Sequence, residues 1–284
     1  TLAEQREACR RRYAELTLDF TKEEQTLLRA CIERVYPILK EHYPLAARVP
    51  WSLIKKSDQL EAGAHFTRED HIVLSERFLK AMVRDSKDLK IDDLVGAVMP
   101  LLLHEQAHVL QRLHPKLFAK LYADLWEMEH VKTIETNDWL DARLLVNPDA
   151  VDVNWIARVK DEDSGATRLL WPRILLRKTQ WPVAMFRDAE MVVLELEQTG
   201  EGDRATYRVK VDDEGIPLRT PLSQAKAYTS RFKHGGAYHP NEAGAGLWPA
   251  IVLGDLLGER GSRPEPVKTY EARARKWLRE AMSP

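Results

Sequence analysis

The stretch of sequence that decides the fold is Leu101-Leu102-Leu103-His104-Glu105-Gln106-Ala107-His108. Four residues turn an α-helix by about 40° beyond one full revolution, so His104 and His108 lie one above the other on the same helix face. Two imidazoles at this spacing can bind one metal ion, and the neighbouring Glu105 is placed to polarise a metal-bound water and accept its proton. The stretch therefore predicts a metal site on a helix.

Zinc is the ion that fits this pattern best, because it accepts three protein ligands and keeps an open position for water. The competing interpretation is a chance match on an exposed helix, in a chain that contains nine histidines. The apolar residues before the pattern argue against chance, since two histidines and a glutamate are costly to bury unless something binds them. We therefore expect a bound Zn²⁺.

The composition excludes several classes of function. The chain of 284 residues has 43 basic and 44 acidic residues and a formal net charge of -1. We expect neither nucleic-acid binding nor membrane insertion, because no global field attracts polyanions and no apolar run reaches the roughly 18 residues that span a bilayer. The first residue is Thr1 rather than Met, so a soluble cytoplasmic protein and an exported one without its leader both stay open. The oligomeric state is unknown at this stage.

The N-terminal half is predicted to be mainly helical. Thr21-Lys22-Glu23-Glu24 is a capping box that opens a helix, and Pro44 and Pro50 predict extended chain beyond the end of that helix. Asp92 or Asp93 can cap the helix that carries the histidines. Helices are predicted over 2–16, 21–42, 76–83, 94–114 and 116–130, and a strand over 71–75.

The chain has two cysteines, Cys9 and Cys31. Their surroundings lack the paired Cys or Cys/His spacing of a structural zinc site. They form either a disulfide across a helical hairpin or two buried thiols on apolar helix faces.

From about residue 147 the hydrophobic pattern changes from helical to alternating. Strands are predicted over 151–157, 191–196 and 206–211, with a turn at 199–203 between the last two. Two further helices are predicted, from about 239 and over 267–282. The fold class is therefore α+β, as one domain over 1–284 with a helical part (1–146) that holds the metal helix, a mid-chain antiparallel sheet part (147–216) and a C-terminal helical part (217–284).

The histidine pattern resembles that of the zincin metallopeptidases, and in particular their glutamate-liganded members. In that family a His-Glu-x-x-His helix lies beneath a small sheet whose edge strand binds extended peptide, which implies that 71–75 is the edge strand here. The segments 104–112, Asn147-Pro148-Asp149 and Tyr238-His239-Pro240-Asn241-Glu242 are similar to a poorly characterised bacterial group of zinc peptidases.

The resemblance implies a third ligand, for which two glutamates compete. The late His-Pro-x-Glu segment of the bacterial group supplies a ligand, which corresponds to Glu242. The aminopeptidase branch of the glutamate zincins instead implies Glu127, separated from His108 by 18 residues. We expect Glu242, in the first turn of a helix that Pro240 can open, although a first-turn glutamate often serves only to compensate the helix dipole.

These features predict a zinc-dependent hydrolase, of the metallopeptidase type, that cleaves a peptide or small amide substrate. Glu105 is the expected general base, and Tyr228 or His239, with Tyr238 as a third candidate, is expected to donate a hydrogen bond to the developing oxyanion. Packing or capping is the alternative role of each donor. Two other functions stay open: a metal- or peptide-binding module without turnover, and a metalloenzyme that acts on a small molecule.

Overall fold

The computed structural model describes every residue of the chain except 151, 161–164, 181–184, 259–263 and 284. Its contacts divide it into two units, the first comprising Thr1–His114 and Leu247–Pro284 and the second comprising Pro115–Gly246. The division falls inside helix α10 (Pro240–Leu257), so one continuous helix contributes residues to both units. Helices and strands are mixed, in agreement with the predicted α+β class.

The first unit begins with helices whose starts follow the capping rules. Helix α1 (Leu2–Glu15) is followed by α2 (Lys22–His42), and the predicted capping box is confirmed: Thr21 Oγ1 accepts from the Glu24 N–H at 3.1 Å, and Glu24 Oε2 accepts from the Thr21 N–H at 2.8 Å. The expectation of extended chain at Pro44 is wrong. Pro44 opens the short helix α3 (Pro44–Ala47), because its missing N–H needs no partner at a helix start.

A four-stranded sheet in the first unit has the order β1-β2-β4-β3, for β1 (Thr17–Leu18), β2 (Ser52–Lys56), β3 (Phe66–Arg68) and β4 (His71–Ser75). The predicted strand over 71–75 is confirmed as β4, and α4 (Glu76–Asp85) follows it directly. Its expected place at the sheet edge is wrong, because β4 pairs with β2 on one side and β3 on the other. Four of its five residues are buried, which explains the interior position.

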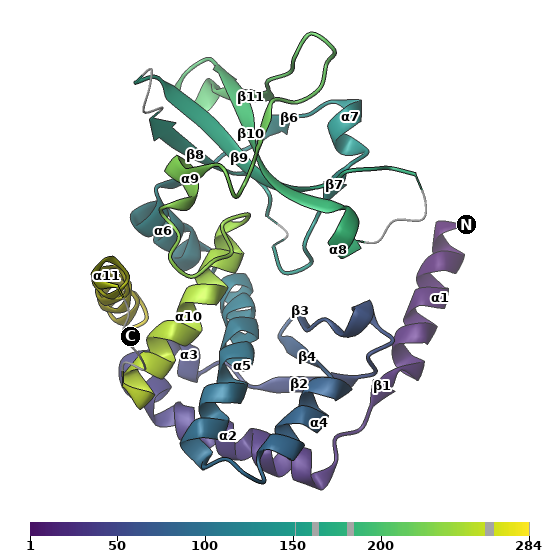
Figure 1. Cartoon of the computed structure of the whole chain (residues 1–284), viewed down its shortest axis with the longest axis vertical. Coiled ribbons are helices and arrows are strands. Elements are labelled where there is room, and N and C mark those ends of the chain that lie inside the picture. The colour runs from purple at the N-terminus through teal and green to yellow at the C-terminus, as the bar shows by residue number, and fades with distance from the viewer. Residues whose placement is uncertain (151, 161–164, 181–184, 259–263, 284) are drawn as a thin grey trace. The chain divides into compact units, whose positions relative to one another are not determined.

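The long helix α5 (Ile91–Leu113) carries the whole His-Glu-x-x-His pattern. It packs against β3 and β4 of the sheet (Figure 1), and Arg112 Nη2 donates to Thr67 Oγ1 of β3 at 2.5 Å. The expected cap by Asp92 or Asp93 is wrong: the N-cap is Lys90, and the Asp92 carboxylate instead accepts from Arg34 Nε at 2.8 Å.

Helix α10 lies beside α5 in the first unit. Trp248 Nε1 of α10 donates to Gln106 Oε1 of α5 at 3.3 Å, and the Trp248 ring meets the Tyr43 ring edge-on. Further along α10, Asp255 accepts a hydrogen bond from Tyr43 and is ion-paired with Arg275 of helix α11 (Glu265–Ala281). These buried polar contacts fix the axis of α10 relative to the helix that carries the histidines.

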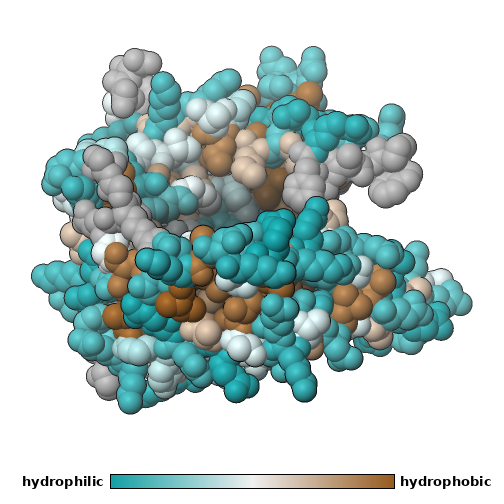
Figure 2. Space-filling model, turned by 60° about the horizontal axis from the view of Figure 1, so that its bottom comes forward, coloured by the Kyte–Doolittle hydropathy of each residue, from teal (hydrophilic) through white to brown (hydrophobic). Residues whose placement is uncertain are grey.

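A groove of about 750 Å³ follows α2 on the surface of the first unit. Its lining is largely apolar and includes Leu28, Ile32, Tyr36, Trp51 and Leu53. The lining holds no His or Cys, so the groove offers no metal-binding set. Figure 2 is turned so that the bottom of Figure 1 faces the viewer, and on this face hydrophobic residues gather among hydrophilic ones.

Within the described part of the chain, no helix combines the length and the apolar composition that crossing a membrane would require. The two cysteines are both free, Cys9 exposed and Cys31 buried. The disulfide alternative is therefore absent from the structure, and the buried-thiol alternative holds for Cys31 alone.

The second unit contains the mid-chain sheet. Its strand order is β5-β8-β9-β10-β11-β6, with β7 added on β9 and β12 on β10. Neighbouring strands are antiparallel except for β11 and β6, which are parallel. The strands are β5 (Met128–His130), β6 (Ile134–Glu135), β7 (Leu144–Leu145), β8 (Trp155–Lys160), β9 (Thr167–Leu176), β10 (Ala189–Thr199), β11 (Thr206–Val209) and β12 (Arg219–Pro221). Three short helices accompany them, α7 (Asp138–Asp141), α8 (Met185–Asp188) and α9 (Lys226–Thr229).

Two predicted boundaries in this unit are wrong. The strand expected over 151–157 begins at Trp155; Val151 lies outside the described residues, and the Asp152 side chain accepts from the Asn154 N–H and so favours a turn before the strand. The helix expected over 116–130 is α6 (Pro115–Trp126), which ends where Glu127 adopts a left-handed φ of 52°. The following residues form β5 and pair with β8.

Candidate metal centre

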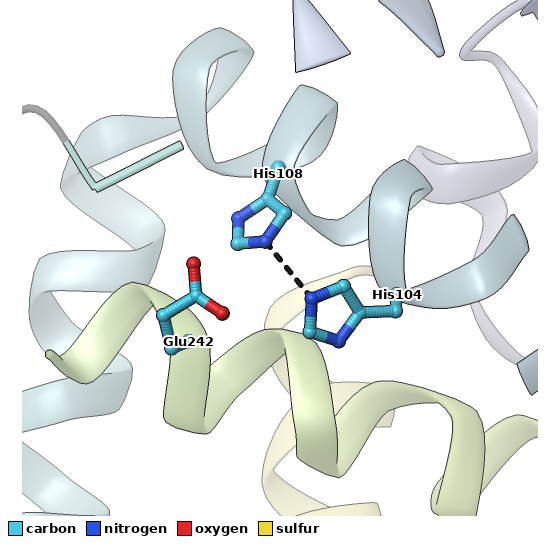
Figure 3. Close-up of side chains that lie close together, drawn as sticks. All are labelled: His104, His108 and Glu242. Atoms are coloured by element: carbon cyan, nitrogen blue, oxygen red, sulfur yellow. Dashed lines mark hydrogen bonds between the residues drawn. The ribbon is translucent and has the colours of Figure 1, made fainter. Parts of the chain in front are cut away.

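Three predicted metal ligands lie together, His104 and His108 on α5 and Glu242 in the first turn of α10 (Figure 3). One donor atom from each side chain lies within 4.8 Å of the other two. His108 is 1% exposed and Glu242 is 8% exposed, so two of the donors are shielded from water. The three residues are close enough to hold a metal ion, and their positions alone do not identify which ion.

The two imidazoles face each other through their Nε2 atoms, which are 3.2 Å apart. With Zn–N bonds of about 2.0–2.1 Å and a tetrahedral angle, two ligand nitrogens of one zinc lie about 3.3 Å apart. The observed separation therefore suits a shared ion without rearrangement of the helix. In the same tetrahedral geometry the carboxylate oxygen would also lie about 3.3 Å from each nitrogen, so it would have to approach by up to about 1.5 Å from its place in the cluster.

Gln111 sets the tautomer of His108. The amide oxygen Oε1 of Gln111 lies 2.9 Å from His108 Nδ1. Because that oxygen can only accept, Nδ1 carries the proton and Nε2 presents its lone pair towards His104. A hydrogen bond of this kind to the second ring nitrogen is the usual support of a metal-binding histidine.

Asn147 holds the carboxylate of Glu242 in place. Its Nδ2 donates to Glu242 Oε1 at 2.7 Å and to the hydroxyl of Tyr238 at 3.0 Å, while its Oδ1 accepts from the Asp149 N–H at 3.0 Å. Both amide hydrogens and the amide oxygen are used, so the orientation of the side chain is fixed. Burial, with the negative charge of Glu242 as a further cause, raises the pKa of Tyr238 above its ordinary value. The sequence pattern singled out the Asn147 triplet without indicating this contact.

We expect Asn147→Ala to weaken metal binding about 10–100-fold, the usual loss when a residue that orients a ligand is removed. Asn147→Asp should weaken it further, because a second carboxylate oxygen would face Glu242 Oε1. Competition with a chromogenic chelator measures the affinity. Asn154→Ala is the matched control, since the Asn154 amide donates to the Lys132 carbonyl and does not contact Glu242. Equal affinity of Asn147→Ala and the wild type would contradict this role.

The other glutamates make different contacts. Glu105 follows His104 on α5 and is 4% exposed, so its side chain is buried with the helix. The rival ligand Glu127 is 79% exposed in its side chain and pairs with Arg231 at 3.5 Å. Glu129 pairs with Arg158 at 2.8 Å. In the described part of the chain the candidate metal cluster contains Glu242 and neither of these two.

The two predicted oxyanion donors are both engaged with the backbone. Tyr228 is fully buried, and its hydroxyl donates to the Ala237 carbonyl at 2.8 Å. His239 Nε2 donates to the Asp152 carbonyl at 2.5 Å, and its Nδ1 accepts from the Asn241 N–H at 3.1 Å. These bonds are those of packing and capping residues. Tyr238, the third candidate donor, contacts Asn147, which also holds the Glu242 carboxylate.

His239 is expected to make stability depend on pH. Burial lowers its pKa from 6.5 to about 4. Between these values the unfolded chain binds a proton that the folded chain does not, so the free energy of unfolding falls as the pH drops from 6.5 towards 4, by at most about 1.4 kcal/mol per pH unit. Denaturant unfolding of the metal-free chain at pH 7 and pH 5 should show a loss of up to about 2 kcal/mol that is absent in His239→Gln. An equal loss in both proteins would show that His239 titrates normally.

Comparison of the chain with models of known protein families, with curated proteins and with solved structures found no match. The donor set itself, two imidazoles and one carboxylate, is typical of catalytic zinc sites with an open position. The same donors also bind other first-row divalent ions. The chemistry argued below is derived from these side chains.

Proposed function

We propose that the chain is a metal-dependent hydrolase of the zinc metallopeptidase type that cleaves peptide or amide bonds. The observation that carries the proposal is the cluster of His104, His108 and Glu242. Three protein donors leave a coordination position for water, which hydrolysis needs and a purely structural zinc site lacks.

Each residue has a distinct task in this proposal. A bound zinc ion would supply Lewis acidity and lower the pKa of its water. Glu105, next to His104 on the same helix, would act as the general base that accepts a proton from the attacking water. Gln111 keeps His108 in the tautomer that presents Nε2, and Asn147 orients the Glu242 carboxylate. Tyr238 is the candidate donor to the developing oxyanion.

Metal analysis of the purified full chain tests the site. We expect about one zinc per chain after dialysis against a weak chelator, and none in the double variant His104→Ala/His108→Ala. Retention of the full metal content by the double variant would place the metal elsewhere.

Digestion of a peptide library, read by mass spectrometry, tests the reaction. Cleavage by the metal-loaded wild type, its absence in the double variant and its loss on chelation would support a metallopeptidase. A loaded protein that binds peptides without cleaving them would favour the binding module. Cleavage of small amides in place of peptides would favour a small-molecule metalloenzyme.

A further inference from the structure

Arg173 is a buried cation in the middle of β9. It is 5% exposed, and its guanidinium lies over the ring of Trp171 with Cζ 4.3 Å from the ring centroid. Its Nη2 donates to the carbonyl of Val153. Its Nε is also buried and has no hydrogen-bond partner among the described residues.

The charge of Arg173 has no anionic partner within the part of the chain that the structure describes. The carboxylate whose field reaches it, Asp152, is paired with His130 at 2.9 Å. Burial accordingly lowers the pKa of Arg173 from 12.5 to about 9. Buried charges are almost always paired with an opposite charge, because an ion loses its hydration in the interior, and the Val153 carbonyl and the Trp171 ring supply no such charge to Arg173.

A small cavity adjoins Arg173. Its volume is about 10 Å³, the space of a single water-sized atom. Its polar lining is Arg173, Asn147, Tyr238 and His239. The Asn147 amide and the His239 ring nitrogens already have partners, and the Tyr238 hydroxyl is hydrogen-bonded to Asn147 and Glu242. The polar atom of the lining that lacks a partner among the described residues is therefore Nε of Arg173.

We propose that Arg173 anchors an anion-binding site at this cavity, which takes one small anion: a chloride ion or one oxygen of a carboxylate. A neutral water would satisfy the Nε–H donor but would leave the buried charge uncompensated. The site does not depend on the metal, although an anion there would lie next to Asn147 and Tyr238, which are linked to each other and, through Asn147, to Glu242.

Thermal unfolding of the metal-free full chain tests the site. Chloride or acetate replaces methanesulfonate at constant ionic strength, and the unfolding midpoint is followed for wild type, Arg173→Met and Arg168→Met. Arg168 is the matched control, a half-buried arginine on the same strand that is ion-paired with Glu195. In the wild type we expect the unfolding midpoint to rise with anion concentration and to saturate, with a rise of about 5 °C when the anion is at a hundredfold excess over its Kd. Arg168→Met should show the same rise, and Arg173→Met should show none.

The anion that acts identifies the ligand. A response to chloride alone assigns a halide site, and a response to acetate assigns a carboxylate, such as that of a substrate. Equal responses of wild type and Arg173→Met to both anions would overturn the proposal. If Arg173→Met does not fold, crystals of the wild type soaked in bromide decide: an anomalous peak within hydrogen-bonding distance of Arg173 supports the site, and its absence, with no acetate seen there either, overturns it.

Discussion

Replacing Glu105 with glutamine is expected to lower kcat on a confirmed substrate by a factor of about 10² or more while the metal content stays unchanged. Glutamine has nearly the same shape as glutamate, so the buried position on α5 tolerates it. It cannot accept the proton of a metal-bound water, which is the task proposed for Glu105. Steady-state kinetics and metal analysis of the same preparation measure both quantities.

Glu271→Gln is the control for this experiment. Glu271 is also a buried glutamate of the first unit, on α11, and is not part of the metal cluster. It should therefore change stability at most and leave kcat as it is. Full activity of Glu105→Gln would remove Glu105 as the base, and loss of the metal in that variant would indicate that it supports the ligands instead.

The parts of the fold that the sequence predicted well are those with local signals. The capping box at Thr21 fixes the start of α2, since it involves residues three apart in the chain. The histidine pair of α5 is a local signal in the same sense, because helix geometry alone brings residues i and i+4 together. The strand over 71–75 is short, has an apolar centre and ends in Ser75, which is the N-cap of α4, and it matches β4.

The parts that could not be predicted depend on contacts between distant residues. Strand β9 is central to its sheet, yet its residues 169–173 are all buried and show no alternation. A continuous apolar run of this kind cannot be told from a buried helix by periodicity, and Pro172 and Arg173 are unusual in a central strand. The interior place of β4 likewise depends on β2 and β3, which pair with it.

The site shows the same division. The spacing of His104 and His108 is visible in the chain, whereas 133 residues separate Glu242 from His108 and a family resemblance indicated it. The contact of Asn147 with Glu242 joins residues 95 apart and has no local signature. Hydrogen bonds that orient ligands join residues that are far apart in the chain and meet only in the folded protein. A single sequence carries no local signal for such contacts.

Replacing Glu242 with alanine is expected to weaken zinc binding by more than the roughly 10–100-fold lost with a residue that only orients a ligand. Glu242 supplies the one negative charge of the cluster and one of its three donors. The variant also removes the hydrogen bond from Asn147 Nδ2 to the Glu242 carboxylate. Competition with a chelator of known affinity gives the change in Kd, and circular dichroism confirms that the fold is kept.

Glu127→Ala is the matched comparison, because it tests the rival ligand with the same substitution. Its exposed carboxylate pairs with Arg231, a surface contact worth at most about 1 kcal/mol, so we expect the zinc affinity of the wild type and little change in stability. The reverse result, with zinc lost in Glu127→Ala and retained in Glu242→Ala, would mean that the metal is held as in the aminopeptidase branch. The cluster in Figure 3 would then be an arrangement of the metal-free chain, in which Glu242 serves only the first turn of α10.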